Sequence, residues 1–347
     1  MKLTTLCYLE REGCYLMLHR VSKKNDVNKD KWIGVGGKFE PGESPEDCLL
    51  REVYEETGYR LTDHALRGIV TFLFNEDEAE YMFLYTAAGF EGTPALCDEG
   101  VLEWVPKEEI DRLYLWEGDR IFFQLLKDEA PFFSLKLRYE DDRLAEAALD
   151  GRPMELLDVL DETGEPSGLV RERTLVHLRG DYHRTVHIWL ARKREDGGYD
   201  LLLQKRSAGK NTFPGCYDTS SAGHVRAGGG FLESALRELS EELGIQAKAE
   251  ELCFLGYRED VYREGRFRNH ERSAVYLYTG PAGIGDLTLQ ADEVESVRWM
   301  DLSEILTRVR QGDPGFCLFE GELLLLRNWL CEKEADCGGE TFRGEEG

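Results

Sequence analysis

The sequence predicts an α/β protein in which one folding unit occurs twice. The order strand, strand, helix, strand, strand, helix is readable on both sides of residue 150. A spacing of glycine, arginine and glutamate in residues 37–59 recurs in residues 223–245. The length of 347 residues also corresponds to about two domains. We therefore expect an internal duplication.

The first half opens with two apolar segments within residues 2–19, separated by a turn at Glu10–Gly13, which predicts a β-hairpin. Helical periodicity then runs from Ser44 to Gly58, with Ser44 as a capping residue and Pro45 suited to the first turn. Further strands are predicted at 68–74 and 81–88, and a closing helix at 116–127.

The second half repeats this order after a turn-rich segment, LDGRP, at residues 149–153. We predict strands at 155–159, 169–173, 185–191, 199–204, 275–278 and 296–300, and helices at 231–243 and 316–332. The expected domains are 1–149 and 154–332, joined by a linker at 150–153. Residues 333–347 are rich in glycine and glutamate and are expected to form a disordered tail.

Composition limits the classes of function. With 43 basic and 68 acidic residues, the net charge is −25, which argues against binding to nucleic-acid polymers or anionic membrane surfaces. No apolar run approaches the roughly 18–20 residues of a membrane span. Nine cysteines without a CxxC pair are typical of reduced thiols in the cytoplasm. A homodimer is compatible with this composition.

Three carboxylates share one face of the first predicted helix. Glu55 and Glu56 lie on either side of Glu52 at helical spacing, and Arg51 can pair with Glu55 one turn later. A solvated acidic face is the simple interpretation. The alternative is a site for Mg²⁺ or Mn²⁺, which prefer oxygen ligands and bridge to phosphates, with one glutamate acting as a base.

The full spacing favours the second interpretation. Residues 37–59, GKFEPGESPEDCLLREVYEETGY, match the Nudix box G-x5-E-x7-R-E-U-x-E-E-x-G-U except at Tyr59. The first half therefore resembles a Nudix hydrolase. This resemblance implies an α/β/α sandwich with a mixed sheet and metal-dependent cleavage of a nucleoside diphosphate linkage. The implied metal ligands are the Gly37 carbonyl and the carboxylates of Glu52, Glu55, Glu56 and Glu99. Arg51 would orient them, and Glu52 or Glu55 would be the base.

The second copy, GHVRAGGGFLESALRELSEELGI, keeps Gly223, Arg237 and Gly244 but has Gly229 where the box has its first glutamate. The glycines at 228–230 predict a mobile loop. Metal binding is expected to survive at Glu238, Glu241 and Glu242, with Arg237, Glu238 and Glu241 in catalytic roles. Glu293, in ADEV, stands where Glu99 stands in the first half.

The first half is similar to the MutT-like branch that acts on oxidised purine nucleoside triphosphates, of 8-oxo-dGTP diphosphatase type. WIGVGGKFEPGE at 32–43 and LYLWEGDRIFFQLL at 113–126 carry this resemblance. It implies that Trp116 and Asp119 contact the base; packing of Trp116 against the closing helix is the alternative. Lys38 is a further substrate-binding candidate. Ile33 stands where a well-known member of the branch has asparagine, and it cannot hydrogen-bond a base.

The second half resembles Nudix proteins related to isopentenyl-diphosphate isomerase, through ELLDVLDETGEPSG, DYHRTVHIWL, LLLQKRS and TFPGCYDTSSAGHV. Ala222 replaces the cysteine that the isomerase needs, and Cys216 does not align with it. Glu271 matches the isomerase's other acid. The resemblance implies metal-binding histidines at His183, His187 and His224. Candidate phosphate contacts are Arg184, Lys205, Arg206 and Lys210.

The leading hypothesis is a tandem Nudix pyrophosphohydrolase that uses Mg²⁺ or Mn²⁺. It would cleave a nucleoside triphosphate, or a related modified nucleotide, to a monophosphate and pyrophosphate. One alternative makes the second half a ligand-binding or regulatory module. A further alternative is a residual isopentenyl-diphosphate isomerase. No basic recognition helix supports a DNA-binding regulator.

Overall fold

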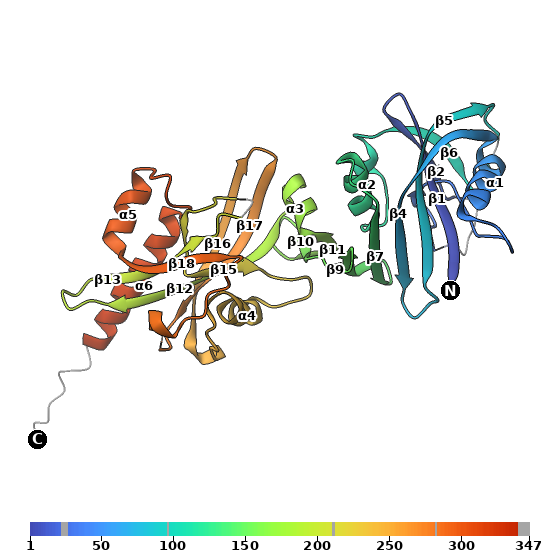
Figure 1. Ribbon diagram of the computed structural model, residues 1–347. Helices are drawn as coiled ribbons and strands as arrows, with labels where there is room; N and C mark the ends of the chain where they lie inside the picture. Colours follow the sequence, from blue (N-terminus) through green and yellow to red (C-terminus); the bar gives the residue numbers. More distant parts are fainter. Residues whose placement is uncertain (22–26, 96, 210–211, 282, 339–347) are drawn as a thin grey trace, which may run out of the picture. The chain divides into compact units, whose positions relative to one another are not determined.

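The chain divides into two compact units (Figure 1), described here from a computed structural model of residues 1–21, 27–95, 97–209, 212–281 and 283–338. The first unit contains Met1–Leu156 together with Gly168–Val176. The second contains Leu157–Ser167 and the described residues from His177 onward. Residues 150–153, predicted as a linker, lie inside the first unit, since Arg152–Pro153 form β9 and pair with β8.

The first unit is built on a mixed sheet. Its strand order is β3-β2-β1-β5-β4-β7-β8-β9, and β6 pairs with β2. The pairs β1–β5 and β4–β7 are parallel, and the others are antiparallel. The strands are β1 Lys2–Arg11, β2 Cys14–His19, β3 Trp32–Ile33, β4 Tyr59–Phe74, β5 Glu80–Gly92, β6 Val101–Pro106, β7 Phe133–Glu140, β8 Arg143–Leu149 and β9 Arg152–Pro153.

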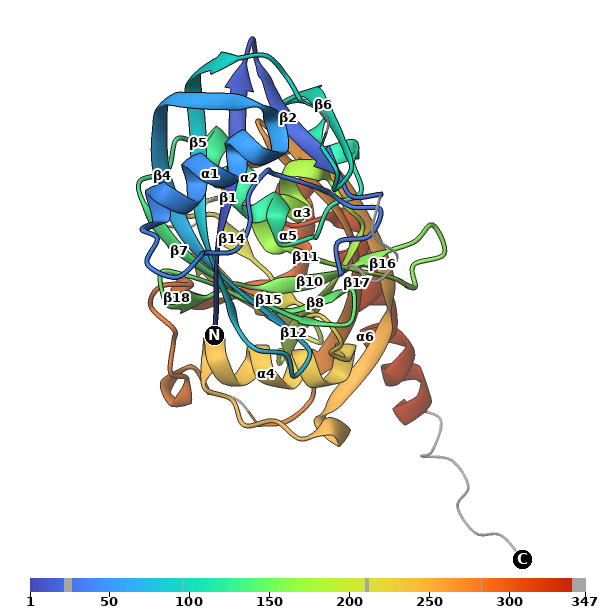
Figure 2. The ribbon, with the colours of Figure 1, turned by 90° about the vertical axis from the view of Figure 1, so that its right-hand side faces the viewer.

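Alternation along β1 gives this sheet two buried faces. Cys7 and Leu9 belong to the hydrophobic cluster that includes Leu49 of α1, Pro45–Thr57. Tyr8, between them, packs against Phe122 of α2, Asp119–Lys127. The two helices therefore cover opposite faces, as Figure 1 shows, and the unit is the expected three-layered sandwich. In the turned view of Figure 2 the two helices overlap. A short 3₁₀ helix, η1 Ile110–Arg112, precedes α2.

The second unit repeats the mixed sheet, with the order β14-β13-β12-β17-β16, β15 paired to β12 and β18 paired to β13. The pair β12–β17 is parallel. Its strands are β12 His183–Lys193, β13 Tyr199–Arg206, β14 Tyr217–Asp218, β15 Ser221–His224, β16 Leu252–Glu264, β17 Phe267–Tyr278 and β18 Val294–Asp301. Upstream, β10 Leu156–Leu160 and β11 Pro166–Glu172 form a separate two-stranded sheet, followed by α3 Arg173–Arg179.

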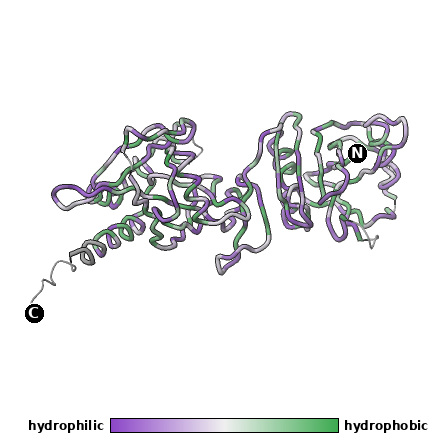
Figure 3. The backbone as a smooth tube through the Cα atoms, turned by 90° about the horizontal axis from the view of Figure 1, so that it is seen from below, coloured by the Kyte–Doolittle hydropathy of each residue, from purple (hydrophilic) through white to green (hydrophobic). Residues whose placement is uncertain are grey.

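The second sheet also has helices on both faces. Val186 and Ile188 of β12 join the cluster formed with α4, Phe231–Leu243. Trp189, which points the other way, joins the cluster formed with α5, Leu302–Arg310, and α6, Glu320–Gly338. Figure 3 shows how hydrophobic and hydrophilic residues alternate along the chain. Short 3₁₀ helices, η2 Ala249–Glu251 and η3 Ile284–Asp286, lie in connections.

The last helix differs from its predicted position. It was expected at 316–332 and is found at Glu320–Gly338, so it continues into the segment predicted as a tail. The remainder of that segment, 339–347, lies outside the described residues. Within the part of the chain that the structure describes, no helix combines the length and apolarity needed to cross a membrane. Each cysteine whose side chain is described is a free thiol.

Candidate active site

Helix α1, which carries the acidic face, has a cap at each end. Ser44 caps it by accepting a hydrogen bond from the backbone N–H of Asp47, whose carboxylate accepts from the backbone N–H of Ser44 in return. Gly58 ends the helix in the left-handed region, at φ 75°. Both helix ends agree with the sequence prediction.

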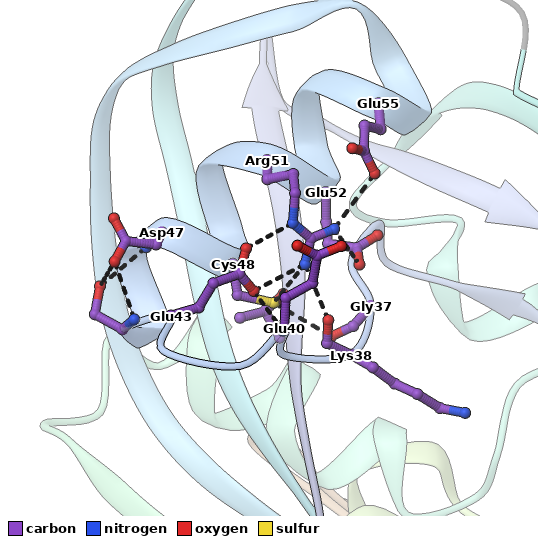
Figure 4. A network of polar contacts seen from close by, with 11 residues as sticks. Gly37, Lys38, Glu40, Glu43, Asp47, Cys48, Arg51, Glu52 and Glu55 are labelled. Atoms are coloured by element: carbon purple, nitrogen blue, oxygen red, sulfur yellow. Dashed lines mark hydrogen bonds and ion pairs between the residues drawn. The ribbon is translucent and has the colours of Figure 1, made fainter.

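Arg51 ties the carboxylates of this region together (Figure 4). Its Nε donates to Glu43 at 2.6 Å, and its Nη1 donates to Glu52 at 2.8 Å and to Glu55 at 3.3 Å. Its Nη2 reaches the carbonyl oxygen of Lys38 at 3.0 Å. The hydrogen bonds from Arg51 hold the pKa of Glu43 at about 2. The guanidinium therefore joins the loop before α1 to the acidic face of the helix.

Glu56 is the buried member of the predicted trio. Its carboxylate accepts a hydrogen bond of 2.8 Å from the backbone N–H of Gly36. Burial raises the pKa of Glu56 to about 8, and the nearby carboxylates of Glu99 and Glu52 add to the rise. Glu99 itself forms an ion pair with Arg20. Glu52, which is also on α1, and Glu99, in the turn before β6, therefore act electrostatically on Glu56.

Gly37 is needed for space rather than for backbone freedom. A Cβ atom at this residue would lie 2.3 Å from the carboxyl carbon of Glu52. Its carbonyl oxygen, predicted to bind metal, accepts a hydrogen bond from the backbone N–H of Thr5 at 2.9 Å and one from the Cys48 thiol at 3.6 Å. Gly37 therefore has a spacing role, and its carbonyl oxygen stays a predicted metal ligand.

The donor set of this site suits a hard divalent cation. Glu52, Glu55, Glu56 and Glu99 offer only carboxylate oxygens, as Mg²⁺ and Mn²⁺ prefer. A cation among them would also favour the ionised form of Glu56, whose burial otherwise opposes its charge. Glu55 is the most accessible of the three helical acids, with 58% of its side chain exposed. The oxygen chemistry of these four carboxylates therefore fits the implied metal.

Trp116 lies in an aromatic cluster of the first unit and is only 4% exposed. Its ring meets Phe72 and Tyr139 edge-on, with centroids 5.5 and 4.7 Å away. Its indole N–H donates to Asn28 at 2.8 Å, and the ammonium of Lys31 lies 4.1 Å from the ring centroid. The structure thus shows Trp116 packed, with a cation over its ring where a base would stack.

Asp119 begins α2 beside this cluster and is buried. Burial raises its pKa to about 8, although the cations Arg120 and Lys31 oppose the rise. At neutral pH the carboxyl group is therefore mainly protonated, so it can donate a hydrogen bond as well as accept one. This is a suitable group for reading the edge of a base.

Helix α4 of the second unit reproduces the geometry of α1. Glu242 accepts hydrogen bonds from the Ser221 hydroxyl at 2.7 Å and from the backbone N–H of Ala222 at 3.1 Å, as Glu56 does from Gly36. A Cβ atom on Gly223 would lie 2.0 Å from Glu238 Oε1, which is the constraint seen at Gly37. The buried ends of the two acidic faces are therefore equivalent.

The exposed end of the second acidic face differs because Gly229 lacks a carboxylate. Arg237 pairs with Glu238 at 2.8 Å and with Glu241 at 3.0 Å, and it donates to the carbonyl oxygen of His224 at 2.9 Å. The N-cap residue of α4 is Gly230, which has no side chain to cap the helix. Arg237 therefore orders the helical acids but lacks the loop carboxylate that Glu43 offers Arg51.

The glycine-rich loop before α4, predicted to be mobile, is held by a residue from β10. Asp158 accepts hydrogen bonds from the backbone N–H of Gly228 at 2.8 Å and from Arg184 at 2.7 Å. A turn hydrogen bond links Gly229 to Arg226 at 2.9 Å. The loop has a carboxylate anchor, supplied from outside the box.

Three histidines form a second donor cluster in this unit. Nitrogen atoms of His177, His183 and His224 all lie within 4.8 Å of one another. Nδ1 of His183 donates to the carbonyl oxygen of Asp181 at 2.9 Å, which leaves Nε2 as the nitrogen with the lone pair. Three imidazoles suit a transition metal better than Mg²⁺.

The histidine cluster differs in one member from the predicted set. His187 pairs with Glu322 at 2.9 Å, while His177, on α3, takes its expected place in the cluster. Burial lowers the pKa of His187, but Glu322 outweighs this effect and raises it to about 9. A histidine six residues before His183 was visible in the sequence, but its position depends on α3, which was not predicted.

The remaining candidates fall outside these clusters. The cations proposed to contact phosphate are already paired: Arg184 with Asp158, Lys205 with Glu295 at 2.7 Å, and Arg206 with Asp218 at 2.8 Å. Lys210 lies outside the described residues. Lys38 is exposed, and Figure 4 shows its side chain pointing away from the Arg51 network. Glu271 lies 4.0 Å from His187, and Glu293 is in the turn before β18.

Comparisons with known proteins identify relatives of this chain. Nudix hydrolase 3 of Arabidopsis thaliana is 39% identical over 170 residues, which are 48% of this chain and 22% of that protein. An uncharacterised Nudix hydrolase of Clostridium acetobutylicum is 38% identical over 151 residues, 44% of this chain and 72% of that protein. The oxidised purine nucleoside triphosphate hydrolase of Danio rerio is 30% identical over 150 residues, 43% of this chain and 94% of that protein.

Among solved structures, the MutT protein of Bacillus halodurans is 26% identical and covers 44% of this chain and 100% of its own, with a TM-score of 0.40. The sequence profile of the NUDIX domain matches residues 2–126 and 181–317, which together exceed half of the chain. The protein therefore belongs to the NUDIX family and carries two NUDIX domains in tandem.

Proposed function

We propose that the first unit is a metal-dependent pyrophosphohydrolase that converts a nucleoside triphosphate to a nucleoside monophosphate and pyrophosphate. NUDIX hydrolases act on phosphoric anhydrides of small molecules and generally use divalent cations such as Mg²⁺ or Mn²⁺. The observation that carries the proposal is the acidic face of α1, where Arg51 orders Glu52 and Glu55 beside the buried Glu56.

Each residue of this face has a proposed role. Glu52, Glu55, Glu56 and Glu99 hold the cation, which, when bound, polarises the phosphate and lowers the pKa of water. Arg51 fixes the direction of the carboxylates. Glu52 or Glu55 accepts a proton from the attacking water as its oxygen bonds to phosphorus. The bridging P–O bond then breaks, and pyrophosphate leaves.

The base would be recognised at Trp116 and Asp119, with Lys38 reaching the phosphates. A base stacked on Trp116 takes the position of the Lys31 ammonium, which can then donate to it. The similarity to the oxidised purine nucleoside triphosphate hydrolase of Danio rerio supports a purine substrate. Ile33 offers no hydrogen bond, so we place recognition of a modified base on Asp119 rather than on β3.

The assignment is tested with Glu56→Gln and Glu242→Gln in the full chain. Each variant removes the buried carboxylate charge from one acidic face and leaves the other unit intact. We expect Glu56→Gln to lower Mg²⁺-dependent turnover of nucleoside triphosphates by at least about 100-fold, the scale for loss of a group that acts in the transition state. Released pyrophosphate and monophosphate are measured by chromatography.

Glu242→Gln is the matched control for this test. It should retain nucleoside triphosphate turnover and lose any activity that belongs to the second unit. If Glu56→Gln hydrolysed nucleoside triphosphates at the wild-type rate and Glu242→Gln did not, the second unit would catalyse the reaction. This result would refute the proposal for the first unit.

For the second unit, we propose diphosphate hydrolysis at Glu238, Glu241 and Glu242, and a separate transition-metal site at His177, His183 and His224. The histidine nitrogens within 4.8 Å of one another support the second site. A ligand-binding or regulatory role remains the alternative for this unit. Residual isomerase activity is disfavoured, because Ala222 has no group that can exchange a proton with carbon.

The histidine site is tested by metal content. The chelator-treated full chain should bind Co²⁺ with a visible spectrum of nitrogen ligation, and His183→Gln should lose this spectrum. Mg²⁺ in excess should not displace this Co²⁺, because Mg²⁺ prefers oxygen ligands. Equal Co²⁺ spectra in wild type and His183→Gln would rule the site out. Glu242→Gln, which leaves the three imidazoles in place, is the control.

A further inference from the structure

The segment before α2 contains both proposed base contacts. Trp116 and Asp119 are separated by Glu117 and Gly118, and Glu117 has only 12% of its side chain exposed. A carboxylate so placed needs cationic partners. The cationic partners of Glu117 therefore help to hold the segment before α2 in place.

Arg171 is the partner that comes from furthest along the sequence. It lies on β11, is 4% exposed, and donates to Glu117 Oε2 through Nε at 3.1 Å and through Nη2 at 3.0 Å. Arg120 donates to the other carboxylate oxygen at 3.2 Å. Both oxygens of Glu117 are thereby engaged by buried guanidinium groups.

Arg171 belongs to the first unit but lies outside the family's sequence profile. The segment Gly168–Val176 is part of the first unit, whereas the profile matches residues 2–126 and 181–317. Two further hydrogen bonds within the first unit hold the segment before α2. Gly118 donates its N–H to the Tyr139 hydroxyl at 2.7 Å, and Arg120 donates to the Leu113 carbonyl at 3.2 Å.

We propose that Arg171 is a positioning residue of the nucleotide site. Through Glu117 it fixes Trp116 and Asp119 in the places where a base is read. The inference rests on the proposed function of the first unit and adds to it a determinant of base recognition. The phosphate chemistry is ordered separately, by Arg51 on α1.

The test is Arg171→Gln in the full chain, assayed with Mg²⁺ on purine deoxynucleoside triphosphates and on inorganic tripolyphosphate. Loss of preorganisation weakens binding of the base, so we expect KM for the nucleotide to rise about tenfold while kcat changes less than about twofold. Any turnover of tripolyphosphate, which has no base, should be unchanged. A defect that is only structural would lower kcat for both substrates alike.

Arg173→Gln is the matched control. Arg173 lies two residues away, is about half exposed, and pairs with Glu155 at 3.4 Å. Its loss should leave both parameters at wild-type values. Glu117→Gln should raise KM at least as much as Arg171→Gln, because it also weakens the contact with Arg120. The double variant should be no worse than Glu117→Gln, because the Arg171–Glu117 ion pair is already lost in that variant. Arg171→Lys should recover part of the nucleotide affinity.

Hydrogen exchange of residues 113–121 separates this inference from the proposed function. Arg171→Gln and Glu117→Gln should exchange faster there than wild type and Arg173→Gln. If wild type hydrolyses no nucleoside triphosphate, the proposed function fails, and the exchange result alone decides whether Arg171 positions this segment. Unchanged exchange, or an equal loss of kcat for nucleotide and tripolyphosphate, overturns the inference.

Discussion

Arg51 and Arg237 stand at equivalent positions and bind different sets of groups. Arg51 joins two helical carboxylates to Glu43 in the preceding loop. Arg237 joins two helical carboxylates to the carbonyl oxygen of His224, as Arg51 joins its own to the carbonyl oxygen of Lys38. One missing glutamate, at Gly229, accounts for the difference. In both units the arginine orders the helical carboxylates. Arg51 also connects the carboxylate of Glu43, in the preceding loop, to the helix.

The buried Glu56 makes Mg²⁺ binding dependent on pH. Burial raises its pKa to about 8, so below pH 8 the cation must displace a proton. We expect the apparent Kd for Mg²⁺ to rise about tenfold for each pH unit below 8. The stability of the metal-free protein changes with pH in the opposite direction to Mg²⁺ binding. The neutral carboxyl group of Glu56 stabilises the fold at low pH. That contribution is lost as the pH rises from about 4.5 to 8.

Calorimetric titration of Mg²⁺ between pH 6 and 9 measures this dependence. Glu56→Gln has no proton to displace and should show a weak, flat profile over the same range. A wild-type profile as flat as that of the variant would contradict the assignment of Glu56 as the proton-linked group.

At the residue scale, sequence spacing was enough to place groups that share one helix. The three glutamates and Arg51 lie together because helical geometry fixes their angles. Gly36 and Arg171 escaped prediction because their partners are distant in the sequence, on α1 and on the segment before α2. His177 escaped prediction because it lies on α3, which was not predicted. The burial of Trp116 is likewise a tertiary effect, set by Phe72 and Tyr139.

At the element scale, the two helices that end in a left-handed glycine were predicted best. The predicted helix at 231–243 coincides with α4, and the one at 44–58 corresponds to α1 with its two caps. Strand β4 was predicted only from residue 68, because its first nine residues are mostly polar or exposed and hide the alternation. Strand β7 was missed although FSLKLRYE alternates between buried and exposed residues, so the signal was present.

The loop before α4 gives an element-scale prediction. Asp158→Asn leaves Arg184 without its buried carboxylate and weakens the hold on Gly228. We expect a loss of about 3 kcal/mol in the free energy of unfolding, as when one partner of a buried ion pair is removed. Hydrogen exchange of residues 226–230 should also be faster. Denaturant titration and exchange measure the two effects.

Glu165→Gln is the control for this prediction. It lies on the same hairpin, is 73% exposed, and pairs weakly with Arg272 at 3.9 Å. Its stability should match wild type. If Asp158→Asn were as stable as Glu165→Gln, the loop would have another anchor.

At the scale of the whole molecule, the duplication was predicted from the repeated box and is confirmed by two profile matches and two mixed sheets. The net charge of −25 fits small anionic substrates once cations mediate the contact, since the acidic faces of α1 and α4 are where such cations would gather.

The exact division of the chain between its two compact units could not be predicted from the sequence. Composition marks a turn near residue 150, whereas the assignment of Gly168–Val176 to the first unit depends on tertiary contacts.

The placement of Gly168–Val176 has a consequence for how such a gene can change. Because Leu157–Ser167 belong to the second unit and the next nine residues belong to the first, no single breakpoint separates the two units. Recombination that inherits only the upstream copy also discards Arg171, the ion-pair partner of Glu117. An exchange of the first copy alone would therefore have to extend through Val176 to keep that unit whole.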